Sequence, residues 1–116
     1  QTAAMLSPYA PKGAAEGSLN MTPEQFSRLA AALDAHGWQV AVSASGDRAV
    51  RVALDAFAGL SKTSNAPKAD RPRRHRIENI TLVDPEDVPR FGALGDDHGW
   101  KWTDALLPIA VTAPRP

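Results

Sequence analysis

Apolar residues recur at helical spacing in the stretch "MTPEQFSRLAAALDAHGW". They are Phe26, Leu29, Ala30 and Leu33. Thr22 stands where an N-cap is needed, Pro23 suits the first helical position, and Gln25 can complete a capping box. Gly37 follows as a C-terminal stop signal. The pattern predicts a helix over residues 23–36, after an irregular N-terminal stretch.

Two short apolar stretches, "WQVAVS" at 38–43 and "HRIENITLV" at 75–83, predict strands. The first is apolar at both parities, which is typical of a strand buried on both faces in a parallel sheet. Between them, "GDRAVRVALDAFAGL" predicts a second helix with one apolar face. That face consists of Val50, Ala53, Leu54, Phe57 and Ala58.

The segment "DPEDVPRFGALG" predicts a third helix, with Asp84 as its cap and Pro85 as its first residue. Asp87 can reach back to the cap, and Gly95 marks the end of the helix. The elements then alternate helix, strand, helix, strand, helix with short links. A strand–helix–strand unit of this length implies a right-handed crossover and parallel strands, so we expect an α/β fold.

Five segments resemble, in order and spacing, an internal stretch of the amidohydrolase superfamily. They are "TAAMLSPYA", "GSLNMTPEQ", "GWQVAVSASGDRAVRVALDAF", "RPRRHRIENITLVDPEDVPRF" and the following "LG". The branch that they resemble most includes the N-substituted formamide deformylases. The resemblance covers residues 1–95, and the tail "DDHGWKWTDALLPIAVTAPRP" at 96–116 has a different texture. We therefore expect an amidohydrolase-like βα fragment followed by a tail from outside the family, either frame-shifted or acquired.

The resemblance implies that the chain corresponds to the fifth and sixth strands of a (β/α)₈ barrel, with their helices. In the family each of these strands ends in a metal-binding His. This chain has Ser43 and Asn79 at those positions, and Asp47 follows in the adjoining turn. These three residues are the expected ancestral site positions. Because hydroxyl and amide oxygens are weak zinc ligands, we expect metal-dependent amide hydrolysis to be lost there.

Other possible metal ligands are sparse, and the chain has three His residues. The densest group of possible ligands is Asp96, Asp97 and His98, to which Asp47, Glu78 and Asp104 could add across a fold or an interface. The alternative interpretation of the group is a solvated turn. A divalent metal is therefore possible, but we do not expect one at the ancestral positions.

Composition narrows the class of protein. The chain has no Cys, which excludes thiolate catalysis and Cys-ligated zinc. Its 13 basic and 13 acidic residues balance, and the basic run "RPRRHR" lacks interleaved aromatics, so we expect no nucleic-acid partner. No apolar run approaches the roughly 20 residues of a membrane span. We expect a cytoplasmic protein whose sequence, lacking an initial Met, starts inside a longer frame or follows a removed tag.

The turn "SASGD" raises two further possibilities. Ser43 could act as a nucleophile beside exposed backbone amides, but His75, as a base, would lie at the opposite end of the neighbouring strand. The start of the second helix could bind a phosphate, although the negative charge of Asp47 opposes it. The alternative is that Asp47 caps this helix.

A partial barrel leaves its sheet uncovered. We expect the inner face, formed by one parity of residues 38–42 with Ile77 or Ile80, to be apolar and to drive association. The fold class is thus a partial barrel with short parallel strands and flanking helices, completed as a homodimer or larger oligomer. One functional hypothesis is a small enzyme whose site, with a small-molecule substrate, lies at the subunit interface. The other is a non-catalytic, self-assembling structural fragment.

Overall fold

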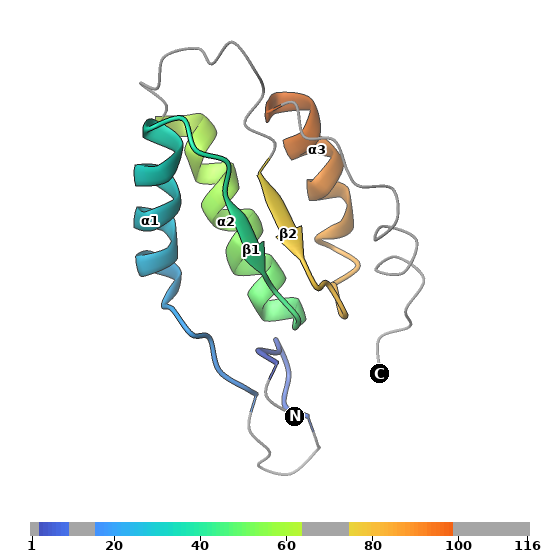
Figure 1. Cartoon of the computed structure of the whole chain (residues 1–116). Coiled ribbons are helices and arrows are strands. Elements are labelled where there is room, and N and C mark those ends of the chain that lie inside the picture. Colours follow the sequence, from blue (N-terminus) through green and yellow to red (C-terminus); the bar gives the residue numbers. More distant parts are fainter. Residues whose placement is uncertain (1–2, 10–15, 64–74, 99–116) are drawn as a thin grey trace.

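Three helices and two strands alternate along the chain in the computed structural model, which describes residues 3–9, 16–63 and 75–98. They are α1 (Pro23–Ala35), β1 (Ala41–Ser43), α2 (Asp47–Thr63), β2 (Arg76–Glu78) and α3 (Val88–His98). The side chains of residues 61–63 and 95–98 lie outside the described part. Figure 1 shows α2 behind the two strands, with α1 and α3 to either side. Within the described residues, no helix is long and apolar enough to cross a bilayer.

The first helix begins at the predicted residue and ends at Ala35, one residue before the predicted end. The Gln25 backbone N–H donates to Thr22 Oγ1 at 3.1 Å, and the Thr22 N–H donates to Gln25 Oε1 at 2.9 Å. This is the predicted capping box, with Pro23 at the first helical position. Gly37 adopts a φ of 81°, the left-handed conformation that terminates helices.

The two strands pair in parallel, as predicted, with Val42 opposite Ile77. Each strand is only three residues long, shorter than the predicted 38–43 and 75–83. At one end, the Val40 N–H donates to the side chain of His75. At the other end, Asn79 takes a φ of 58°, which turns the chain out of extended geometry. A side-chain hydrogen bond at one end and a turn at the other thus limit the length of the paired strands.

The third helix begins later and ends later than predicted. Asp84 caps a turn instead of the helix: its Oδ1 accepts from the Glu86 N–H at 3.0 Å, and its carbonyl accepts from the Asp87 N–H at 2.9 Å. The helix starts at Val88 and continues through Gly95 to His98. An internal Gly costs a helix about 1 kcal/mol, so Gly95 weakens the helix without stopping it.

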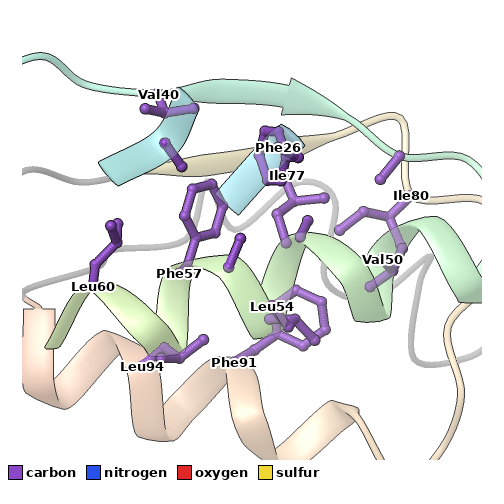
Figure 2. Close-up of a cluster of buried hydrophobic side chains, with 14 residues drawn as sticks. Phe26, Val40, Val50, Leu54, Phe57, Leu60, Ile77, Ile80, Phe91 and Leu94 are labelled. Atoms are coloured by element: carbon purple, nitrogen blue, oxygen red, sulfur yellow. The ribbon is translucent and has the colours of Figure 1, made fainter. Parts of the chain in front are cut away.

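The core lies between α2 and the elements around it (Figure 2). Its largest fully buried side chains are Phe57, Leu54 and Val50, all from α2. Phe57 meets Phe26 of α1 edge to face at 5.9 Å between ring centroids. Phe91 of α3 packs into the same cluster. The apolar face predicted for the second helix is therefore the centre of the molecule.

The expectation of an apolar inner sheet face is wrong. Ile77 and Ile80, like Val40, are buried on the side of α2. Because successive side chains along a strand point to opposite faces, the residues between these apolar ones lie on the other face of the sheet. There Ala41 and Ser43 of β1 are exposed, and Arg76 and Glu78 of β2 form an ion pair at 2.9 Å. The uncovered face is therefore polar, and its burial is not driven by apolar area.

An ion-pair cluster that the sequence did not reveal joins α2 to α3. Arg51 Nε donates to Asp87 Oδ2 at 2.8 Å, and Arg90 reaches Asp87 at 3.1 Å and Asp55 at 2.6 Å. The Asp87 side chain is nearly fully buried. The hydrogen bond with Asp87, supported by the nearby carboxylate of Asp84, raises the pKa of Arg51 above its ordinary value. The cluster therefore links α2 to α3 through the guanidinium groups of Arg51 and Arg90.

Candidate functional site

The two residues at the expected ligand positions meet at the carboxyl end of the sheet. Asn79 Nδ2 donates a hydrogen bond of 2.9 Å to Ser43 Oγ. Ser43 is the last residue of β1, and Asn79 directly follows β2. Because the strands run parallel, their carboxyl ends lie at the same end of the sheet. The structure thus brings together two of the three predicted site residues, and both are exposed.

A second link lies beside the first. Thr81 Oγ1 donates to the carbonyl oxygen of Ser45, and these residues follow the ends of β2 and β1 by three and two positions. The left-handed conformation of Asn79 makes room for this sharp turn, and Asn adopts that conformation more readily than most residues. Side-chain hydrogen bonds therefore tie together the ends of both strands.

This arrangement does not suit a zinc ion. Structural and catalytic zinc sites use His, Cys or carboxylate ligands. Here the side-chain Nδ2 of Asn79 donates a hydrogen bond to Ser43 Oγ. A cation binds lone pairs, and an amide N–H group offers none. Within the described residues, no group of three or more His, Asp or Glu side chains is placed to hold a metal. The hydrogen-bonded pair of Ser43 and Asn79 therefore does not by itself offer the ligands of a zinc site.

The predicted group of acids and a histidine near the end of the chain is only partly described. Asp96, Asp97 and His98 form the last turn of α3, and their side chains lie outside the described residues. Of the possible additions, Glu78 is paired with Arg76, and Asp104 lies outside the described residues. The prediction of a metal at this group stays a prediction.

Asp47, the third predicted site residue, has a different role. Its side chain is buried, and Oδ1 accepts from the Leu6 N–H at 2.7 Å. The carbonyl oxygen of Ala4 accepts from the N–H groups of Arg48 and Ala49, at 3.2 and 3.4 Å. A backbone carbonyl thus occupies the start of α2, the position at which a phosphate could otherwise bind. Asp47 anchors the N-terminal segment.

Further contacts hold this segment against α2. The Met5 N–H donates to the carbonyl of Glu16 at 2.7 Å, and Arg48 Nη2 donates to the carbonyl of Gly17 at 3.0 Å. Gly46 faces Ala4 so closely that a Cβ on Gly46 would lie 1.9 Å from the Ala4 oxygen. The sequence does not predict this contact, and its one sequence signal is a Gly ahead of the helix.

His75 lies at the amino end of β2, far from Ser43, as expected. Its Nδ1 accepts from the Val40 N–H at 3.0 Å, and its Nε2 lies 3.0 Å from Asp34 Oδ1. The ring is buried and stacks on Phe57 with centroids 5.2 Å apart. Because Nδ1 accepts, the ring hydrogen sits on Nε2 and points at Asp34. His75 therefore clamps α1, β1 and β2 together and cannot act as a base for Ser43.

The amidohydrolase family model matches residues 1–105 of the sequence. The chain belongs to the amidohydrolase family. The protein LONG AFTER FAR-RED 3 of Arabidopsis thaliana is 39% identical over 74 residues, which cover 64% of this chain and 12% of that protein. This amidohydrolase-family chain thus spans a small part of its curated relative. No solved structure matches it.

Family membership confirms the predicted amidohydrolase resemblance. The two parallel strands and three helices are compatible with a piece of an amidohydrolase barrel. The deformylase-like branch stays a prediction, as does a change of character at residue 96.

Proposed function

We propose that this chain is a non-catalytic segment of the amidohydrolase fold, in which a hydrogen-bonded pair replaces two metal ligands. The observation that carries the proposal is the 2.9 Å hydrogen bond between Asn79 and Ser43, at the two positions where the family resemblance implies His. The pair supplies no charge and no imidazole nitrogen. Activation of water by a metal at these positions therefore has no support in the donor set.

The alternative of a small enzyme has weaker support. A Ser nucleophile needs a base within hydrogen-bonding reach, usually a His. Ser43 instead meets the amide of Asn79, and both ring nitrogens of His75 are engaged at the other end of the sheet. Asp47 is directed at the Leu6 amide. The three candidate residues thus have structural partners.

Restoring the two imidazoles tests the proposal. The double substitution Ser43→His and Asn79→His is expected to create a weak zinc site of two imidazoles completed by water, because the side chains already converge and His tolerates the left-handed conformation of position 79. We expect micromolar zinc binding by calorimetry for the double variant and none for the wild type. Each single variant serves as a matched control with at least tenfold weaker binding. Stoichiometric zinc binding by the wild type would contradict the proposal.

We propose further that the segment associates with copies of itself. A two-stranded sheet has little stability alone. The backbone N–H and C=O groups of Ala41 and Ser43 face away from β2, toward the open edge of β1, where another strand could pair with them. Trp38, three residues before β1, and Leu29 of α1 are exposed large apolar side chains, at 64% and 44%. These features replace the apolar inner face as the reason for association.

The molar mass in solution tests this association. By sedimentation at micromolar concentration, we expect a mass at least twice the 12.4 kDa of the chain. Replacing Trp38 by Ser should shift the protein toward monomer, because burial of a large aromatic stabilises interfaces. Replacing the exposed Glu24 by Gln, on the first turn of α1, is the control and should leave the mass unchanged. A stable wild-type monomer would refute the association.

A further inference from the structure

A groove of about 680 Å³ lies beside the carboxyl end of β1, bounded by α1, α2 and two parts of the N-terminal region. Its apolar lining includes Phe26, Val42, Val52 and Ala53. Its polar lining is Ser18, Asn20, Ser43 and Ser45. Among the described residues that line it there is no acid, no base and no histidine. The described lining of the groove therefore carries no charged side chain.

The walls of the groove are held in place by hydrogen bonds. The N-terminal wall includes Ala4, whose carbonyl is bonded to the Arg48 and Ala49 amides. The Leu6 amide bonds to the buried carboxylate of Asp47 just beyond this wall. At the other side, Phe26 is fixed by its contact with Phe57 in the core. Because the walls are already ordered, a ligand would bind with little cost in conformational entropy.

We infer that this groove binds an uncharged, largely apolar small molecule. Its volume lies within the range of roughly 300–1,000 Å³ found for small-molecule sites. An ionised ligand would lose hydration without meeting an opposite charge, whereas Ser and Asn can satisfy one or two neutral polar atoms. The inference does not depend on whether the strand ends bind metal.

Two isosteric probes that differ in charge test the inference on the full 116-residue chain. They are 4-phenyl-2-butanone, which is neutral, and 3-phenylpropanoate, its carboxylate counterpart. We expect the ketone to cause saturable shifts of the backbone amide resonances of Ala49, Val52 and Ala53, which line the groove. The carboxylate should bind at least tenfold more weakly. Equal affinities, or shifts confined to other residues, would overturn the inference.

Two variants in which an Ala is replaced by Phe test where the ketone binds. Ala49→Phe fills the groove and should weaken ketone binding at least tenfold, since Ala49 lines it from the first turns of α2. Ala31→Phe, at an exposed position of α1 outside the groove, should keep the wild-type affinity within twofold. Unchanged binding by Ala49→Phe would overturn the inference. If that variant does not fold by circular dichroism, the comparison of the two probes on the wild type decides.

Discussion

Replacing Gly46 by Ala is expected to detach the N-terminal segment and to lower the free energy of unfolding by roughly 3 kcal/mol. The new Cβ would lie 1.9 Å from the Ala4 oxygen and 2.6 Å from its carbonyl carbon. These are backbone atoms, so no side-chain rotation can relieve the clash. The segment would have to leave, breaking the bonds to the α2 amides and to Asp47.

Urea unfolding and amide hydrogen exchange measure the effect. We expect exchange at Met5 and Leu6 to accelerate at least tenfold in Gly46→Ala, because both amides donate to groups of the folded protein. Gly92→Ala in α3 is the matched control, since a Cβ there meets nothing within 4 Å. Ala favours helix over Gly, so this control should be neutral or more stable by up to about 1 kcal/mol. Equal stability of the two variants would show that the segment is not seated as described.

Replacing His75 by Ala is expected to lower the free energy of unfolding by about 3 kcal/mol. The change leaves the Val40 N–H without its acceptor and removes the ring that stacks on Phe57. It also removes the contact that joins β2 to Asp34 of α1. Losing a buried acceptor costs about 1–3 kcal/mol, and the lost ring packing adds to this.

The matched control is another histidine of the same chain. His36 lies at the C-terminal cap of α1 with an exposed side chain, so His36→Ala should change stability by less than about 0.5 kcal/mol. His75→Gln should recover part of the loss, since its amide oxygen can accept from Val40. The free energy of unfolding of all three variants is measured by urea unfolding at constant pH. An equal loss for His36→Ala and His75→Ala would contradict the clamp.

Local signals predicted much of the fold. The capping box at Thr22 and Gln25 and the terminating Gly37 fixed α1 because each acts within one helical turn. The short strand–helix–strand connection predicts the parallel pairing. The length of the strands is not predicted by a local pattern, because it depends on His75, a residue distant in sequence that accepts a hydrogen bond from the Val40 N–H. Long-range side-chain contacts of this kind leave no periodic pattern.

The sequence does not predict which face of the sheet is buried. A strand apolar at both parities, such as 38–43, does not reveal which face meets the helices. The pairing of Val42 with Ile77 decides it, and both point toward α2. The start of α3 was misplaced for a related reason, because Asp84 and Asp87 form a turn with the same residue types that cap helices.

The sequence predicts that Ser43 and Asn79 lie close together, but it does not predict their hydrogen bond, and their role as a site stays a prediction. The parallel strands place Ser43 and Asn79 at one edge, as the sequence implied. The burial of Asp47 against Leu6 depends on a segment 41 positions away, which no local pattern encodes. The groove likewise arises only when that segment meets α1 and α2.

The side-chain amide of Asn79 reports most directly on the central claim that the two strand ends bond to each other and not to a metal. Its NMR signals can be followed while the wild-type chain is titrated with Co²⁺, a paramagnetic substitute for zinc. We expect the signals to stay unchanged with Co²⁺ and to shift on Ser43→Ala, which removes the acceptor. Saturable broadening of the Asn79 and Ser43 signals by Co²⁺ would contradict the account.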